Sequence, residues 1–214
     1  MERILILLAG YPATGKSYLL GRIQERFGHQ FESVALDDFK ERLWDEVGFD
    51  SAEEKAELEK EIYRRYYECV RALMGRGVPV VLDYVFSDKQ KGVLAKYADE
   101  FDYRVMTIRL VGDPVKIYER SLSRDLAPTR HLGHLVSRYH PGDSLEDRSK
   151  ADALVSRETF LDRCSHKGYQ YFELGTLLEV DATDVSAIDY GAILDRIEEF
   201  VAGAIASGAD TAGA

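Results

Sequence analysis

Residues 10–17 read Gly10-Tyr11-Pro12-Ala13-Thr14-Gly15-Lys16-Ser17 and match the phosphate-binding pattern G-x-x-x-x-G-K-[ST]. The two glycines allow the backbone to wrap closely around phosphate oxygens, so that N–H groups and the positive end of the next helix point at the anion. We expect Lys16 to place its charge at the β and γ phosphates and the Ser17 hydroxyl to ligate Mg²⁺. The pattern predicts a nucleoside triphosphate site that extends to Tyr18.

The residues on either side of this loop have the pattern of a strand followed by a helix. Residues 4–9 form a continuous apolar run, as a buried parallel strand requires. After the loop, Leu19, Ile23 and Phe27 recur at helical spacing, and Gly28 offers a stop. The four fixed positions alone match by chance in about one chain in a hundred of this length. The strand and helix around them make a chance match rarer still.

The composition is that of an ordinary globular protein. The chain has 214 residues, of which 31% are charged and 45% apolar. This length is enough for one well-buried core, so we expect a single domain over residues 1–206. Residues 207–214 are rich in Gly and Ala, and we expect them to form a disordered tail.

Net charge and hydropathy bear on the partners of the protein. The formal net charge is −10, which disfavours a long nucleic acid as partner without excluding a local basic groove. No apolar run approaches the roughly 20 residues that span a bilayer, and the first apolar run has no cleavage region after it. The chain has only two cysteines, so no disulfide framework is implied. We therefore expect a cytoplasmic protein without a membrane partner.

Short apolar runs alternate with helical patterns along the chain. Ser51 with Glu54, and Ser87 with Gln90, have the spacing of a capping box, and Asp113-Pro114 supplies an N-cap and a first-turn proline. Alternation repeated about five times predicts an α/β fold, with a parallel sheet covered by helices on both faces. We expect strands at residues 4–9, 31–36, 78–82, 103–111 and 177–180, a further strand-like run at 169–174, and a helix at about 151–164.

Acidic residues follow two of the predicted strands. Asp37 and Asp38 come after the second strand and Asp83 after the third. Ligands of such sheets bind outside the carboxyl ends of the strands, which is also where the phosphate loop lies. Asp37 is therefore our candidate for the carboxylate that accepts a proton from an incoming hydroxyl. The alternative is that Asp37 or Asp38 only caps the helix ahead of Phe39.

A helix after the fourth strand carries a pair of arginines. Arg120 and Arg124 lie four residues apart and hence on one face of that helix. They suit a lid over the triphosphate, although ordinary solvated arginines are the simpler alternative. Residues 126–150 follow at once and show no clear period, which is typical of a functional or mobile loop. We expect the lid and a substrate loop at about residues 115–150.

The irregular segment is rich in histidine and arginine. His131, His134 and His140 invite a metal site, but no thiolate or dense carboxylate set accompanies them at a standard spacing. Structural or substrate-loop histidines are favoured instead. Arg130 is a candidate to bind the substrate, and Arg130, His131, Arg138 and His140 together are candidates to recognise an anionic acceptor.

Two other nucleotide-binding classes lack their signatures here. The chain contains no asparagine, so the Asn-Lys-x-Asp guanine signature of common GTPases is absent, and it has no Leu-Ser-Gly-Gly transporter signature. A phosphotransferase remains, and we expect an ATP-dependent kinase that phosphorylates a hydroxyl of a small-molecule acceptor. The alternatives are a polynucleotide 5′-hydroxyl kinase and, in another class, a nucleotide-dependent switch without catalysis.

The sequence resembles the small P-loop kinases. Asp37-Asp38-Phe39-Lys40, after Gly15-Lys16-Ser17, resembles the Asp-Asp-Tyr-Arg element of bacteriophage polynucleotide kinase. The likeness extends to Leu82-Asp83 and to the spacing of Arg120 and Arg124. The chain is also similar to zeta toxins, chloramphenicol phosphotransferase and gluconate kinases. Lys40 departs from the arginine of that element, which weakens bidentate phosphate recognition there.

This resemblance implies a fold, cofactors and residue roles. The fold would be a three-layer P-loop NTPase sandwich with a five-stranded parallel sheet of order 2-3-1-4-5 and a helical lid, and the cofactors would be ATP and Mg²⁺. Independently of the resemblance, we expect Asp38, Lys40 and Arg130 to bind the acceptor. The implied roles are phosphate and metal contacts for Lys16 and Ser17, general base for Asp37, metal shell or substrate pocket for Asp83, lid for Arg120 and Arg124, and adenine contacts for Asp181 and Thr183.

Overall fold

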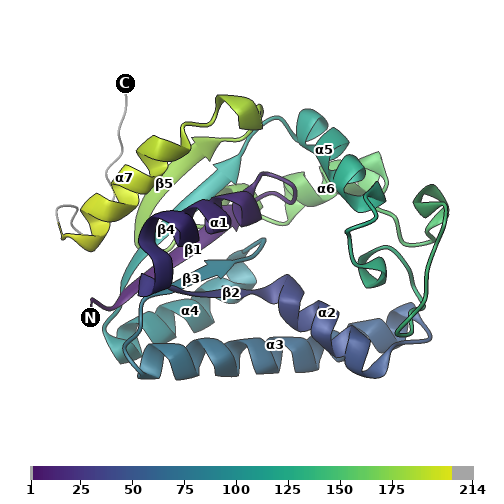
Figure 1. The fold of residues 1–214 in the computed structure, drawn as a ribbon, viewed down its shortest axis with the longest axis horizontal. Helices are drawn as coiled ribbons and strands as arrows, with labels where there is room; N and C mark the ends of the chain where they lie inside the picture. The colour runs from purple at the N-terminus through teal and green to yellow at the C-terminus, as the bar shows by residue number, and fades with distance from the viewer. Residues whose placement is uncertain (1, 204–214) are drawn as a thin grey trace.

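A single five-stranded parallel sheet forms the centre of the computed structural model, which describes residues 2–203 (Figure 1). The strand order is β2-β3-β1-β4-β5, and all four neighbouring pairs are parallel. This confirms the α/β fold class and the order 2-3-1-4-5. The strands are β1 Ile4–Gly10, β2 Glu32–Ala35, β3 Val80–Asp83, β4 Arg104–Val111 and β5 Thr176–Asp181.

Strand β1 divides the core into two halves. It is buried along its whole length, and its side chains alternate between the faces of the sheet. Leu5 and Leu7 pack into a core with α3 and α4, whereas Ile4 and Ile6 pack into a second core with α1 and α7 (Figure 1). The helices are α1 Lys16–Phe27, α2 Leu36–Val47, α3 Ala52–Gly75, α4 Asp88–Phe101, α5 Pro114–Leu126, α6 Arg157–His166 and α7 Tyr190–Val201.

The three helix starts predicted from capping patterns are confirmed. The Ser51 hydroxyl accepts from the Glu54 N–H ahead of α3, the Ser87–Gln90 capping box precedes α4, and Asp113 caps α5 with Pro114 in the first turn. Glu54 departs from the ideal box, because its carboxylate accepts from the N–H of Asp50. Between residues 2 and 203 the regular structure also includes 3₁₀ helices, namely η1 Gly28–Gln30, η2 Leu132–His134, η3 Arg148–Lys150, η4 Tyr169–Tyr171 and η5 Val185–Ala187.

Three sequence predictions are wrong in detail. The second strand ends at Ala35, and Leu36 begins α2, so Asp37 and Asp38 lie in the first turn of a helix. Ala35 is the N-cap residue, so neither aspartate is the N-cap. The strand-like run at 169–174 begins instead with η4, because it turns inward to bury Phe172 against Phe86. The helix expected from residue 151 begins at Arg157, after the Ser156 cap.

Leu126 ends α5, and residues 127–150 contain only short 3₁₀ helices and one bridge residue, as their lack of period predicts. An antiparallel bridge between Phe49 and Tyr139 attaches this segment to the end of α2. The division into one domain over residues 1–206 stays a prediction, and the tail predicted at 207–214 lies outside the described residues. Within residues 2–203, no helix combines the length and apolarity that crossing a membrane requires.

Candidate active site

The phosphate loop is built mainly by its backbone. Gly10 has φ +110°, and a Cβ placed there would lie 1.9 Å from the carbonyl oxygen of Leu110. The N–H of Tyr11 donates to that same oxygen over 3.2 Å, so the loop starts pressed against β4. Gly15 has φ +91° and forms the N-cap of α1 without a side-chain cap. The first N–H groups of α1 therefore face the loop, as an anion site requires.

Lys16 and Ser17 are held by buried partners. Lys16 is 6% exposed, and its Nζ donates to the Tyr11 carbonyl oxygen over 2.6 Å. Burial lowers the pKa of Lys16 to about 8, with a smaller lowering from Arg124 and opposition from Asp83. The Ser17 hydroxyl donates to Oδ2 of Asp83 over 2.7 Å, and burial raises the pKa of Asp83.

The predicted metal residues come together at one point. A hydroxyl and a carboxylate are the oxygen ligands that Mg²⁺ takes, and Mg²⁺ usually keeps several waters and phosphate oxygens besides one or two protein ligands. Ser17 and Asp83, in hydrogen-bond contact at the carboxyl end of β3, fit that demand. Their role at a metal stays a prediction.

The loop opens into a cavity of about 1190 Å³ at the carboxyl edge of the sheet. Five loop residues line it, which are Pro12, Ala13, Gly15, Lys16 and Ser17, and Tyr18 lines it just after the loop. The other three, Gly10, Tyr11 and Thr14, support the loop from behind: Thr14 is fully buried, and its hydroxyl donates to the Tyr11 carbonyl over 2.8 Å. The cavity continues past the loop to α2, α5, α6 and the segment after β5. After their predicted roles, we call the part next to the loop and the segment after β5 the nucleotide side and the part next to α2 and α6 the acceptor side.

An aromatic pair and Arg120 border the nucleotide side. The rings of Tyr18 and Tyr190 meet edge to face at a centroid distance of 4.9 Å. Arg120 donates to the carbonyl oxygens of Ala182, Thr183 (2.7 Å) and Ala13 (3.4 Å), which joins α5 to the segment after β5 and to the loop. Neighbouring residues that sequence reasoning missed also line this side, namely Val185, Ser186, Ile188 and Tyr190.

Asp181 and Thr183 do not line this cavity, and their place beside adenine stays a prediction. Oδ1 of Asp181 accepts from the Thr183 N–H, and the Thr183 hydroxyl accepts from the N–H of Asp113. The Asp181 side chain thus shapes the turn after β5, and the Thr183 side chain joins that turn to the start of α5. The residues just beyond them, from Val185 onward, line the cavity instead.

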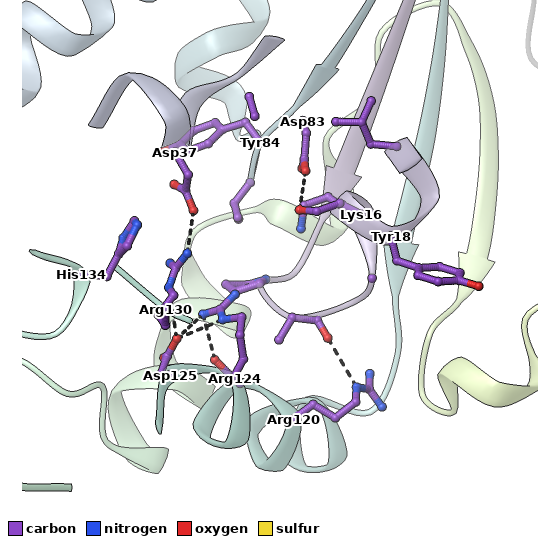
Figure 2. Close-up of a pocket in the computed structure, with 18 of the residues that line it drawn as sticks. Lys16, Tyr18, Asp37, Asp83, Tyr84, Arg120, Arg124, Asp125, Arg130 and His134 are labelled. Atoms are coloured by element: carbon purple, nitrogen blue, oxygen red, sulfur yellow. Dashed lines mark hydrogen bonds and ion pairs between the residues drawn. The ribbon is translucent and has the colours of Figure 1, made fainter. Parts of the chain in front are cut away.

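Asp37 is paired with two cations. Its carboxylate lies 3.3 Å from Nζ of Lys40. It also lies 3.3 Å from a terminal nitrogen of Arg130, as Figure 2 shows by a dashed line. Burial raises the pKa of Asp37, but Lys40, His134 and Arg130 outweigh it and hold this pKa well below its ordinary value. Asp38 also lines the cavity, and its pKa is raised by burial and by the nearby carboxylates of Glu41 and Asp37.

Arg124 reaches a partner that the sequence did not suggest. Its Nε and one terminal nitrogen donate to Oδ1 of Asp125, over 2.9 and 2.7 Å. Asp125 is 6% exposed and lines the cavity beside Arg130 (Figure 2). A carboxylate next in sequence to an arginine is too common a pattern to have singled it out.

The three histidines of the irregular segment each bind a carboxylate at or just after α2. His131 lies 3.1 Å from Asp45, His134 2.7 Å from Glu41 and His140 3.0 Å from Asp50. Among residues 2–203, no group of three or more such side chains could hold a metal ion. Of the four residues considered for an anionic acceptor, only Arg130 lines the cavity; the other three, His131, Arg138 and His140, attach the segment to Asp45 and Asp50.

The acceptor side includes further residues that no motif marks. Tyr84 follows Asp83, has the Lys40 ammonium over its ring at 5.3 Å, and shares a hydrogen bond of 2.7 Å with Tyr63. Burial raises the pKa of Tyr84 to about 12, so its hydroxyl stays protonated at neutral pH. From α6 and the segment after it come Phe160, Arg163, Cys164 and Tyr169.

A family profile described as an AAA domain matches residues 5–141, which is more than half of the chain. No curated protein sequence matches the chain significantly.

Several solved structures have the same fold. A suspected kinase from Chloroflexus aurantiacus aligns with a TM-score of 0.71 and 21% identity, over 96% of this chain and 100% of that one. A sugar kinase from Janibacter sp. aligns with a TM-score of 0.53 and 13% identity, over 97% of this chain and 100% of that one. A gluconokinase from Sinorhizobium meliloti aligns with a TM-score of 0.53 and 15% identity, over 94% and 93%.

Proposed function

This chain belongs to the AAA domain family, and from that premise we propose that it is an ATP-dependent kinase whose acceptor is a hydroxyl of a small molecule. The observation that carries the proposal is one cavity with two functional sides. A phosphate-binding loop with Lys16 and Ser17 lines one side, and the carboxylate of Asp37 lines the other. Phosphoryl transfer needs this combination of phosphate ligands and a residue that orients the nucleophile.

On the nucleotide side, the loop N–H groups and Lys16 bind the triphosphate, and Arg120 and Arg124 approach it from α5. The charge of Lys16 stabilises negative charge on the transferring group. Mg²⁺, when bound at Ser17 and Asp83, neutralises charge on the β and γ phosphates. The aromatic pair Tyr18 and Tyr190 lines the wall where we place the base of the nucleotide.

On the acceptor side, Asp37 accepts the hydrogen bond of the attacking hydroxyl and takes its proton. As the hydroxyl oxygen bonds to the γ-phosphorus, the bond from that phosphorus to the bridging β-phosphate oxygen breaks and ADP leaves. The low pKa of Asp37 makes it a weak base. Such transition states are largely dissociative, however, so positioning of the hydroxyl matters more than base strength. Asp38, with its raised pKa, is the second candidate for this role.

The acceptor we propose is a compact polar molecule such as a sugar or a sugar acid. The same fold is used by a sugar kinase and a gluconokinase, which supports a small substrate. The net charge of −10 argues against a long nucleic acid. Lys40 and Arg130 provide cations beside Asp37 for the polar groups of the acceptor. A cytoplasmic location stays a prediction.

The test is a screen of sugars, polyols and sugar acids for acceptor-dependent release of ADP, followed by Asp37→Asn. We expect this variant to lose about 10³-fold in kcat, because the hydroxyl is no longer oriented and deprotonated. Its Kd for Mg·ATP should stay within about twofold, since Asp37 does not touch the loop.

The matched control is Asp38→Asn, which removes one carboxylate from the same helical turn. If Asp38→Asn lost kcat and Asp37→Asn kept it, the role of the base would pass to Asp38. Tight nucleotide binding without acceptor-dependent ADP release, across the screen and with a 5′-hydroxyl oligonucleotide, would instead favour a nucleotide-dependent switch.

A further inference from the structure

One carboxylate oxygen is shared between two arginines of the cavity. Oδ1 of Asp125 accepts two hydrogen bonds from Arg124 and lies 3.6 Å from Nε of Arg130. The side chain of Asp125 is 9% exposed, so few water molecules can replace either partner. Figure 2 shows Arg130 between Asp125 and Asp37, with Arg124 beside them.

Arg130 is incompletely satisfied in this arrangement. Its Nε is buried and donates to no acceptor. A terminal nitrogen of the same guanidinium lies 3.3 Å from Oδ2 of Asp37. A buried N–H without an acceptor costs free energy, so Arg130 gains if Asp125 becomes available to it.

The surroundings let one side chain move and hold the other in place. Arg124 has 39% of its side chain exposed and lines the cavity, so it can turn toward the phosphate loop without leaving a packed core. The side chain of Arg130 is 17% exposed, and Arg148 donates to its carbonyl oxygen over 2.7 Å. The backbone of Arg130 is thereby fixed, and a movement of its guanidinium of about an ångström suffices to reach Asp125.

We propose that Asp125 is a positioning residue that holds Arg124 while the nucleotide is absent and takes Arg130 once Arg124 has turned to the triphosphate. This inference rests on the proposed function, because it requires that Arg124 contact a phosphate group. Of the two arginines, Arg124 is the one that turns to the triphosphate, because its side chain is more exposed than that of Arg130.

The exchange prepares Asp37 for the acceptor. When the Nε of Arg130 bonds to Asp125, its terminal nitrogen draws away from Oδ2 of Asp37, and that oxygen becomes free to accept from a hydroxyl. The other charged groups that act on Asp37 are Lys40, Asp38 and His134, together with Lys16 and Asp83. These stay in place, so nucleotide binding would order the steps, with nucleotide first and acceptor second.

The test follows the Nε–H signal of Arg130 by NMR of ¹⁵N-labelled protein, with and without the non-hydrolysable analogue Mg·AMPPNP. We expect the analogue to slow exchange of this proton with water by about tenfold, because a hydrogen bond now protects it. The signal is assigned by its loss in Arg130→Lys. Binding of the analogue is measured in parallel by calorimetry.

Two variants and a control separate this role from a structural one. In Asp125→Asn the protection should not appear on addition of the analogue. In Arg124→Met no other arginine competes for Asp125, so the Arg130 signal should be protected with or without the analogue. This second variant changes a half-exposed side chain, so it tests the inference even if Asp125→Asn fails to fold. Glu119→Gln removes an exposed carboxylate from the same helix and should behave as the parent protein.

The outcomes distinguish the inference from the proposed function. Binding of the analogue with an unchanged Arg130 signal would overturn the exchange and leave the kinase proposal standing. Protection that persists in Asp125→Asn would assign Arg130 another acceptor and also overturn it. No binding of the analogue would overturn the proposed function and the exchange together.

Discussion

The two sides of the cavity are built in different ways. The nucleotide side is made by eight consecutive residues whose shape is set by glycine backbone and a buried strand. The acceptor side is made by side chains distant in sequence, such as Asp37 and Arg130, which lie 93 residues apart and meet through charge. The nucleotide side therefore has one conformation that the fold imposes. On the acceptor side, the charged side chains can form ion pairs in more than one combination.

This difference separates what the fold requires from what the reaction requires. A change in the loop backbone should disturb the sheet itself, because Gly10 touches β4. A change in one ion pair of the acceptor side should leave the sheet intact. Three predictions probe this contrast, in decreasing order of expected effect.

The largest effect is expected for Gly10→Ala. A Cβ at this position would overlap the carbonyl oxygen of Leu110, and φ +110° is strained for any other residue. We expect a loss of at least about 3 kcal/mol in the free energy of unfolding, measured by urea denaturation. Gly21→Ala is the control, because it lies inside α1 with open space around its Cβ, and it should gain about 0.5–1 kcal/mol. Equal stability of the two variants would refute the close approach.

An intermediate effect is expected for the pH dependence of nucleotide binding. Lys16 has its pKa lowered to about 8, so it is charged below that pH and neutral above it in the free protein. Because the triphosphate favours the charged form, affinity for Mg·ATP should be highest below pH 8 and about tenfold weaker at pH 9 than at pH 7. Calorimetry near pH 8 should also detect proton uptake on binding. Lys16→Met should bind Mg·ATP weakly, and its affinity should depend little on pH over this range. If the affinity of the parent protein were equally independent of pH, Lys16 would not be the group that titrates near pH 8.

The smallest effect is expected for Tyr139→Phe. The Tyr139 hydroxyl donates to Asp45 over 2.5 Å and joins the irregular segment to α2. Its removal should cost about 1 kcal/mol of the free energy of unfolding, as typical for one hydrogen bond, and leave the Kd for Mg·ATP within about twofold. Tyr171→Phe, at a residue 72% exposed, should change neither quantity. A large loss of nucleotide affinity in Tyr139→Phe would show that the two sides are not separable.

The sequence predicted features that depend on contiguous residues. The phosphate loop, the burial of β1, the caps at Ser51, Ser87 and Asp113 and the strand–helix alternation all follow from local spacing and hydropathy. The end of β2 was missed by one residue, because Leu36 is apolar and buried in either a strand or the first turn of a helix. The run beginning at Tyr169 has strand-like composition but packs as η4, which only tertiary contacts decide.

The pairing of charges was beyond the reach of local pattern. Local pattern does not show how the long irregular segment returns to α2. It therefore could not predict the contacts of Asp37 with Arg130, of His134 with Glu41, and of Asp125 with two arginines. Asp181 and Thr183 illustrate the same limit on the nucleotide side. Asp181 ends β5 and Thr183 follows it, but Asp181 bonds within the turn and Thr183 bonds to Asp113, and the cavity is lined from Val185 onward.

The bridge between Phe49 and Tyr139 attaches the irregular segment on the acceptor side to the residues just after α2, outside the central sheet. Sequence insertions or replacements between residues 126 and 150 would thus change the acceptor side without adding or removing a strand of the sheet. Under the proposed function, a change of acceptor would therefore require changes only in this segment, while the phosphate loop and the sheet stay as they are.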